Sequence, residues 1–581
     1  MGRVKSLLGI GLCVFLLLGC GGGGGGNKNS DDNSWLSISP NSVGVTTVVG
    51  VSTPFTITAT SSKTISQTLY PVFIDNAGVL NPYATVITPL SQLQYKGEFA
   101  TSSTLAQGSY QGNFSLWLYT DSNHTNAYPG SPWTIPYQIT VGPVRVTHKL
   151  LPDSVGVAFS STPAGDRLTK SILVADNLGK TTPWQATSDK SWLTVTAAGT
   201  TGTPGTTLTL TADPTNLPLD VISYVTVTLT SSDTSVQPIE KIQVGLWKGS
   251  ANVQRTDVAT GFPSADINLV NGLSPNICVD PVRPYVYLTY SSNVVDCYNI
   301  YTATKVASIK LDNNAPVLPP SFQGPAAGSM AITSDGSKLY VGNDLGFSAQ
   351  IFSLPEMAPI GVIPYFNSTL SYARPNGVGV ILSSNGDAVL ASTSTRLPYQ
   401  GPRGMVATTD SGAFYNPVDD AGQSFIGRYS MDFSEFKGGT LITKLENHAS
   451  DTNGPYSRFV LSPDGARLYE AALSSKLLRL DPVTLAVLGT FQCDSSAWFG
   501  QVRVGNDGRV YYATQSSNDL FSIGILGADD RLISTQVANP QTLPAGIGTY
   551  NGFKGGFVVS ADCMVLVVNS NTVVQFLPVL P

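Results

Sequence analysis

Side chains that commonly carry chemistry are sparse in this sequence. Only three of its 581 residues are histidines, namely His124, His148 and His448. No HxxxH, HExxH or CxxC spacing occurs, so the sequence offers no histidine or thiolate site for a metal ion. It also lacks a Gly-x-Ser-x-Gly turn and a phosphate-binding glycine loop. We therefore predict no catalytic residue, no bound metal and no cofactor.

Carboxylates are the remaining candidates for acid–base chemistry or calcium binding. Adjacent aspartates occur at Asp31–Asp32, Asp419–Asp420 and Asp529–Asp530. Neighbouring side chains point apart on an extended chain, and loop acids are commonly just solvated. His448, in the segment LENHASDTNGPYSR, is a candidate general base. A polar loop position is the commoner interpretation of this histidine.

Cys20 is the one residue to which we assign a chemical role. A short basic segment (MGRVK) precedes the apolar run 7–18, and small residues follow it, which is the order of a secretory signal. The run is well short of the ~20 residues that cross a bilayer, so a permanent membrane helix is the weaker interpretation.

The segment LLGC at 17–20 resembles the lipobox of bacterial lipoproteins. The resemblance implies cleavage before Cys20 and attachment of lipid to its sulfur and its new amino group. An ordinary signal peptide is the alternative. Residues 20–34 (CGGGGGGNKNSDDNS) have no other apolar content, which predicts a flexible tether.

Composition limits the class of protein. The chain is too long for one core and favours about three domains. Charged residues make up 12%, and the net charge is −6, so the basic surface that nucleic-acid binding requires is missing. Beyond the tether, period-two alternation replaces helical periodicity, which predicts an all-β protein.

Two related segments follow the tether. The spacing of a motif that occurs in both gives each a length of about 110 residues. Ser-Val-Gly-Val occurs at 42–45 and again at 154–157. Alternating strands recur in both segments, as in GSYQGNFSLWLYTD and ISYVTVTLTSSD, with turn residues between them. This pattern predicts two tandem immunoglobulin-like sandwiches.

The second segment carries a more specific resemblance. Residues 182–218 contain Trp184, the sequence SWLTV at 191–195, a Gly-Thr-rich turn and a strand that leads into Ala-Asp-Pro. They resemble the BACON family of bacterial immunoglobulin-like domains, which implies an association with carbohydrates or a spacer role. Trp184 and Trp192 could stack on sugars, but strand tryptophans more often belong to the core.

From about residue 255, strand pairs surround one kind of turn. Asp-Gly and Asn-Gly favour hairpins because glycine accepts the positive φ of the turn. The turns stand near 281, 335, 386, 464, 507 and 562. Segments such as SPDGARLYEAALSSKLLRLDPVTLAVLGTF resemble YVTN and WD-repeat-like bacterial β-propellers. The long gap after 386 could hide a blade that includes 425–447, giving seven blades; six with an insertion is the alternative.

The propeller interpretation also bears on the cysteines and the ends of the domain. Cys278 and Cys297 fall on strands separated by one other strand, roughly 9–10 Å apart, which is too far for a disulfide. Cys563 takes a turn-glycine position and Cys493 follows an outer strand, so we predict mostly free, buried thiols. SADINLV (264–270) is expected to complete the last blade. Long insertions at 312–328 and 395–423 are the expected contact surface.

These observations favour a non-enzymatic, lipid-anchored envelope protein that presents a propeller as a binding or adhesion module for a glycan or a protein. The alternatives are a propeller enzyme of the lactonase, glycosidase or quinone-dependent dehydrogenase type, and a periplasmic assembly scaffold. We expect outer-membrane placement if the host has an outer membrane. The expected parts are a signal peptide (1–19), a tether (20–34), a sandwich (35–145), a BACON-like sandwich (146–250) and a propeller (255–581).

Overall fold

A computed structural model provides the fold. It describes residues 33–49, 52–82, 84–91, 93–102, 104–142, 147–196, 198–202, 206–260, 276–289, 293–311, 327–343, 348–366, 369–397, 405–408, 412–416, 425–434, 440–450, 458–462, 465–471, 476–492, 497–516, 521–527, 529–537, 556–569 and 573–579.

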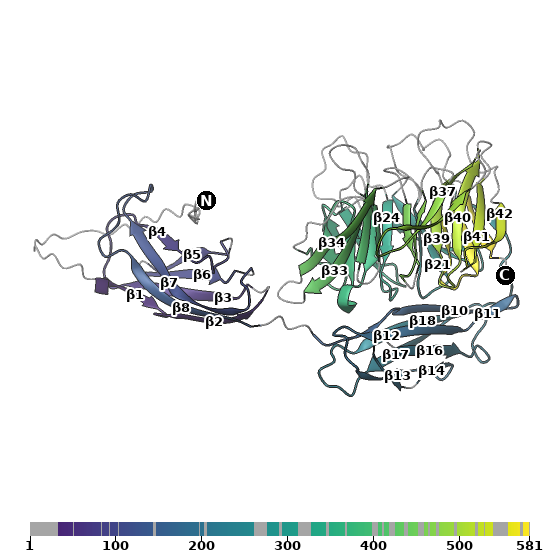
Figure 1. The fold of residues 1–581 in the computed structure, drawn as a ribbon, viewed down its shortest axis with the longest axis horizontal. Coiled ribbons are helices and arrows are strands. Elements are labelled where there is room, and N and C mark those ends of the chain that lie inside the picture. The colour runs from purple at the N-terminus through teal and green to yellow at the C-terminus, as the bar shows by residue number, and fades with distance from the viewer. Residues whose placement is uncertain are drawn as a thin grey trace, which may run out of the picture. The chain divides into compact units, whose positions relative to one another are not determined.

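The predicted all-β class is confirmed. Apart from two short 3-10 helices, η1 (Asn33–Trp35) and η3 (Pro375–Gly377), the regular elements of the described residues are strands (Figure 1). None of the helices in this part of the chain could span a bilayer. The chain divides into two compact units between Val146 and Thr147.

The first unit contains two four-stranded sheets, here called the first module. Aromatic and branched side chains from both sheets form a shared core, in which Phe114 and Ile139 are fully buried. One sheet has the order β1 (Leu36–Ser39), β3 (Pro54–Ser61), β6 (Gln94–Ala100), β5 (Val86–Ser91). The other has the order β2 (Val43–Val48), β8 (Trp133–Gly142), β7 (Gly108–Tyr119), β4 (Tyr70–Ile74).

The second unit begins with another two-sheet body, here called the second module. Its core is one cluster that includes Trp184, which is 1% exposed, with Trp192 packed against it. The core interpretation of Trp184 is therefore confirmed. The larger sheet has the order β11 (Gly165–Arg167), β10 (Gly156–Thr162), β18 (Glu240–Lys248), β17 (Ile222–Thr230), β13 (Pro183–Ser188), β15 (Ala198–Thr200). The smaller has the order β14 (Leu193–Val195), β16 (Thr206–Ala212), β12 (Thr169–Asp176), β9 (Leu150–Pro152).

The repeated Ser-Val-Gly-Val motif occupies the same structural position in both modules. Each copy runs into a strand that pairs in parallel with the last strand of its module, β2 with β8 and β10 with β18. The registers also agree, since Gly44 lies opposite Gln138 and Gly156 lies opposite Gln243. The two segments thus share a local topology as well as a sequence motif.

Seven further sheets follow in the described part of the second unit, teal through green to yellow in Figure 1. Six have four strands and one has three. In chain order their strands are β20 (Ile277–Val279), β21 (Tyr285–Thr289), β22 (Val294–Asn299), β23 (Thr304–Lys310); β24 (Ala327–Ile332), β25 (Lys338–Asn343), β26 (Ser348–Ser353), β27 (Pro359–Pro364); β28 (Leu370–Ala373), β29 (Val380–Ser383), β30 (Ala388–Leu390); β31 (Met405–Thr408), β32 (Gly412–Asn416), β33 (Phe425–Ser434), β34 (Thr440–Ser450); β35 (Arg458–Leu461), β36 (Leu468–Ala471), β37 (Lys476–Leu480), β38 (Val487–Gln492); β39 (Ala497–Val504), β40 (Val510–Ser516), β41 (Phe521–Leu526), β42 (Leu532–Val537); and β43 (Gly556–Val559), β44 (Val565–Asn569), β45 (Val573–Pro578) with β19 (Thr256–Ala259).

The first strands of these sheets contact one another in chain order. β20 contacts β24, and the contacts continue through β28, β31, β35, β39 and β43. β43 in turn contacts β20. Apolar clusters fill the spaces between successive sheets, for example between β20–β23 and β24–β27. Each sheet therefore buries both of its faces against its neighbours.

Two sequence predictions in this region are corrected. The hairpin at 386 joins β29 to β30, and the first turn of that sheet is instead η3, where Asn376 and Gly377 both have positive φ. The segment 395–423 is not one long insertion, because it contributes β31 and β32. The predicted hidden unit at 425–447 is present, since β33 and β34 complete that four-stranded sheet.

The last sheet takes its fourth strand from the beginning of the region. β19 pairs with β45, from Thr256 opposite Phe576 to Ala259 opposite Val573. The prediction of an added N-terminal strand is right in kind but wrong in position, because we assigned it to 264–270. That segment lies outside the described residues, as does nearly all of the predicted loop 312–328.

Three cysteines are free thiols, as predicted. Cys278 and Cys297 both pair with Tyr287, one from each side, so a whole strand separates them. Cys563 has φ +60° in the turn between β43 and β44. The equivalent turns of four other sheets have a glycine at positive φ, namely Gly336, Gly377, Gly465 and Gly508. Cys493 lies outside the described residues.

Candidate functional site

The predicted candidates for chemistry do not come together. Cys20 and the aspartates at 31–32 and 419–420 lie outside the described residues. Asp530 is a structural acid, since it accepts hydrogen bonds from Tyr469 and from Arg479. His448 lies on β34 with an exposed side chain rather than in a loop. Among the described residues, no group of three histidines, cysteines or acids is arranged to hold a metal ion.

A cavity of about 290 Å³ lies among the first strands of four sheets, β24, β28, β31 and β35. Hydroxyl groups provide its polar side chains. Thr408 Oγ1 donates to the carbonyl oxygen of Tyr372 at 2.7 Å, and the Tyr372 hydroxyl lies 3.3 Å from Ser334 Oγ. The described residues that line it are Met330, Ala331, Ile332, Leu370, Ser371, Tyr372, Thr408, Phe459, Val460 and Leu461. This lining can contact a ligand through apolar and hydroxyl groups but supplies no acid or base for proton transfer.

Cys278, on the first strand β20, is not an activated nucleophile. Burial, together with the charge of Asp280, raises the pKa of its thiol to about 12, although Arg503 opposes the shift. The guanidinium of Arg503 lies 5.9 Å from the ring of Phe557, on β43. Because the thiolate is the reactive form, a thiol with such a pKa is inert at neutral pH.

A buried ion pair that sequence reasoning missed fixes the first turn. The carboxylate of Asp280, which is 0% exposed, accepts hydrogen bonds from Arg283 Nη1 at 2.9 Å and from the Tyr287 hydroxyl at 3.1 Å. Arg283 Nη1 also donates to the carbonyl oxygen of Gly336, in the equivalent turn of the next sheet. Arg467 makes the same kind of bond to Gly508, 3.3 Å away in the turn of the sheet that follows it. These arginines tie neighbouring turns together.

The second module packs directly on these turns. A Cβ atom on Gly156 would lie 2.0 Å from the carbonyl oxygen of Ser334, and one on Gly245 would lie 2.1 Å from that of Val282. Only glycine allows such an approach of backbone to backbone, because a real Cβ atom would overlap the oxygen. The two glycines of β10 and β18 therefore define a close contact surface.

Side chains extend this contact surface. The rings of Trp247 and Tyr301 stack with centroids 5.8 Å apart. Arg374, which is 5% exposed, lies 3.5 Å from the carboxylate of Glu240 and donates to the carbonyl oxygen of Pro152 at 3.3 Å. Burial raises the pKa of Glu240, and the charge of Arg374 opposes that shift. The second module and the turns thus share a buried polar interface.

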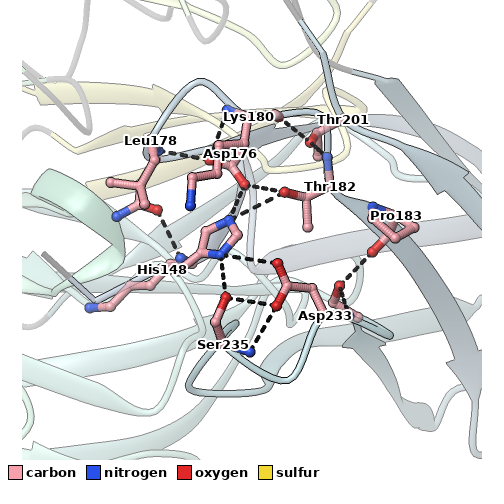
Figure 2. A network of polar contacts seen from close by, with 12 residues as sticks. His148, Asp176, Leu178, Lys180, Thr182, Pro183, Thr201, Asp233 and Ser235 are labelled. Carbon is pink, nitrogen blue, oxygen red and sulfur yellow. Dashed lines mark hydrogen bonds and ion pairs between the residues drawn. The ribbon is translucent and has the colours of Figure 1, made fainter.

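Near one end of the second module, His148 lies at the centre of a polar network (Figure 2). Its Nε2 lies 2.5 Å from Asp176 Oδ2, and its Nδ1 lies 2.8 Å from Ser235 Oγ. Thr182 donates to the same Asp176 oxygen at 2.6 Å, and Asp233 Oδ2 lies 3.5 Å from His148 Nδ1. The segment before β9, the end of β12 and the loops before β13 and β18 meet at this point.

The electrostatics of this network favour an ionised Asp176. Its burial would raise the pKa, but hydrogen bonds from Thr182, His148 and the N–H groups of Lys180 and Leu178 outweigh it, so the pKa is lowered. The hydrogen bond from the Ser235 hydroxyl is the main cause that lowers the pKa of Asp233.

Serine, histidine and aspartate are the residue types of a hydrolytic triad, but this arrangement does not meet the requirements of one. The Ser235 hydroxyl has a competing acceptor in Asp233 Oδ1, 2.7 Å away. The backbone N–H groups of Ser235, Val236 and Gln237 all bond within the cluster, so none of the three is free to stabilise an oxyanion. The network therefore fixes the loops of the module and does not activate a nucleophile.

The chain is thus an all-β protein whose second module joins a polar network to a buried interface. Residues 147–240, which contain the whole network, match a protein family described as the viral BACON domain. The match confirms the resemblance to BACON domains that the sequence around Trp184 and residues 191–195 indicated. No curated protein gives a significant match to the sequence.

Proposed function

We propose that this chain is a lipid-anchored, non-enzymatic protein of a bacterial cell envelope that presents a seven-bladed β-propeller as a binding module for a glycan or another protein. The observation that carries the proposal is the BACON match at 147–240, since such a module is compatible with binding or adhesion. Two immunoglobulin-like sandwiches precede the propeller in this proposal.

The sheets after residue 255 support the propeller part. Their first strands contact one another in chain order from β20 to β43, and β43 contacts β20. β19 supplies the fourth strand of the last sheet, as expected when the two ends of a propeller close it. The cavity of about 290 Å³ among four of the first strands is lined by groups suited to binding.

The second module has a fixed place in this proposal. Because Gly156 and Gly245 pack against the turns at Ser334 and Val282, it covers part of the turn side of the sheets. A ligand is therefore expected on surface that the second module leaves uncovered. In this view the second module is part of the propeller's support and not an independent spacer.

Lipid anchoring rests on the sequence at 17–20 and is tested separately. Cells expressing the full chain are fed an alkyne-labelled fatty acid, and the labelled protein is detected in membrane fractions. We expect Cys20→Ser to abolish labelling and membrane association and Cys13→Ser to retain both. Labelling that survives Cys20→Ser would refute anchoring at this residue. Protease treatment of intact cells then separates surface display from a periplasmic location.

Binding is tested with a glycan array and with pull-down from envelope fractions, using the full chain. We expect a glycan or protein partner whose capture is lost when Tyr372→Ala and Thr408→Ala are combined in the inner cavity. A Ser37→Ala variant, in the first module, serves as the control. Turnover of lactones, glycans or alcohols by the purified chain would contradict the non-enzymatic assignment.

A further inference from the structure

The first module contains an apolar cavity between its two sheets. Its volume is about 110 Å³, and both sheets contribute side chains to it, together with the segment between β3 and β4. Its lining residues are Trp35, Leu36, Ile38, Ile57, Ala59, Ser61, Lys63, Ile65, Leu69, Pro71, Phe73, Ile87, Tyr95, Gly97, Phe99, Leu116, Leu118 and Ile135. A cavity of this size is close to the ~150 Å³ apolar cavity that stays dry and binds benzene.

The cavity offers a ligand almost no hydrogen bonds. Ser61 is 8% exposed, and its hydroxyl donates to the carbonyl oxygen of Lys63 at 2.5 Å. Water in such a space would lack the two to four polar partners that it needs. An apolar group is therefore the suitable occupant.

Loose packing of the whole module does not explain the cavity. On one side of it, Phe73 lies 4.4 Å from Phe99, and Phe114 lies 4.4 Å from Tyr137, measured between ring centroids. On another, Trp35 packs edge-on against Trp133 at 5.3 Å. The neighbouring core is thus closely packed, while apolar residues that face the cavity are left half-buried, among them Ile38, Ala59, Ile87 and Leu116.

The charge of the lining has one sign. Lys63 is exposed, and its Nζ lies 4.9 Å from the centroid of the Trp35 ring, which itself lines the cavity. The described lining includes no aspartate or glutamate. An ammonium group beside an apolar cavity complements a ligand with a hydrocarbon chain and an anionic head.

We propose that this cavity binds the alkyl chain of a fatty acid or similar anionic amphiphile, with the head group at Lys63 and the chain between the two sheets of the first module. This site is independent of the proposed function, because every lining residue belongs to the first module and none to the sheets after residue 255.

The test is calorimetric titration of the full chain with sodium salts of butanoate, hexanoate, octanoate and decanoate. Each added methylene is expected to tighten binding about fourfold until the cavity is full, because burying one CH₂ is worth about 0.8 kcal/mol. Ala59→Leu, which fills the cavity, is expected to weaken octanoate binding at least tenfold. Thr60→Leu is the control, because Ala59 and not Thr60 lines the cavity.

The head group is tested by comparing octanoate with octanol. Lys63→Gln is expected to weaken octanoate binding several-fold and to leave octanol binding unchanged. Absence of saturable binding, affinity that does not depend on chain length, or full binding by a folded Ala59→Leu variant would overturn the site. Equal affinity for octanol and octanoate in the native chain, with no effect of Lys63→Gln, would overturn the anionic head group.

Discussion

Replacing Gly245 by alanine tests whether the second module and the sheets after residue 255 act as one unit. The new Cβ atom would lie 2.1 Å from the carbonyl oxygen of Val282, and the backbones must separate by about 1 Å before the contact reaches 3.0 Å. A shift of this size also opens the Trp247–Tyr301 stack. The aromatic stack is worth about 0.5–1.5 kcal/mol. The hydrogen bond from the charged Arg374 to the carbonyl oxygen of Pro152, in the same interface, is worth about 1.5–3 kcal/mol. We therefore expect the interface to be weakened by about 2–4.5 kcal/mol, the sum of the two contributions.

Differential scanning calorimetry of the full chain measures the effect. In the native chain the second module and the sheets should unfold in one transition. In Gly245→Ala, a separate transition of the module is expected about 10 °C lower or more, since 1 kcal/mol moves the Tm of a domain of about 100 residues by roughly 4–8 °C. Gly202→Ala is the matched control, because its Cβ would meet no atom within 4 Å. An unchanged single transition in Gly245→Ala would show that the contact between Gly245 and Val282 does not hold the module and the sheets together.

Three further predictions concern single side chains. Asp176→Asn should cost about 1.5–3 kcal/mol, because hydrogen bonds to a charged group are worth that much. Because the pKa of Asp176 is lowered in the fold, the stability that its carboxylate contributes is present above about pH 4 and is lost as the pH falls below that. The variant should therefore flatten the acid limb of a stability–pH curve, unlike Asp166→Asn at an exposed position. Cys278 should resist iodoacetamide at pH 8 until the chain is denatured, as read by peptide mass mapping, because its pKa is raised to about 12; rapid alkylation of native protein would contradict this. Ala59→Leu should raise the free energy of unfolding by up to about 2 kcal/mol in urea titrations, since an empty cavity costs about 24 cal/mol per Å³. Thr60→Leu should not raise it, because that change fills no cavity and removes the hydrogen bond that Gln94 donates to the Thr60 hydroxyl.

Local turn chemistry could be predicted from the sequence, but the assignment of turns to sheets could not. Two Asn-Gly pairs stand nine residues apart at 376–377 and 385–386, and both form turns with glycine at positive φ. Each is a strong hairpin signal, yet neither says which pair of strands lies innermost. The sequence prediction took the pair at 385–386 as the first turn of its sheet. That assignment left a long gap after residue 386 and made β31 and β32 look like an insertion. At Cys563 the local pattern was sufficient. Its alignment with the turn glycines correctly predicted that it lies in a turn and is buried.

The polar clusters were missed because their members are distant in the sequence. His148 meets Asp176 and Ser235 only after the module has folded, across 28 and 87 residues. Nothing in the local sequence distinguishes this histidine from a solvated one. The Asp280–Arg283 pair is local, but its role depends on Gly336 in the next sheet. The periodicity of a sequence indicates which residues are buried. Partners that are distant in the sequence can be identified only when the topology of the fold is known.

The pairing of β19 with β45 has a consequence for how the chain is made. Asp257 and Gln575, which pair across these strands, are 318 residues apart in the sequence. The sheet that joins them cannot form until β45 has left the ribosome, however early the other sheets begin to assemble. Throughout synthesis β45's partner strands therefore lack their last neighbour, and a chain that stops before residue 573 leaves two sheet edges exposed to aggregation. Completion of this sheet thus depends on β45, whichever of the other sheets have formed before it.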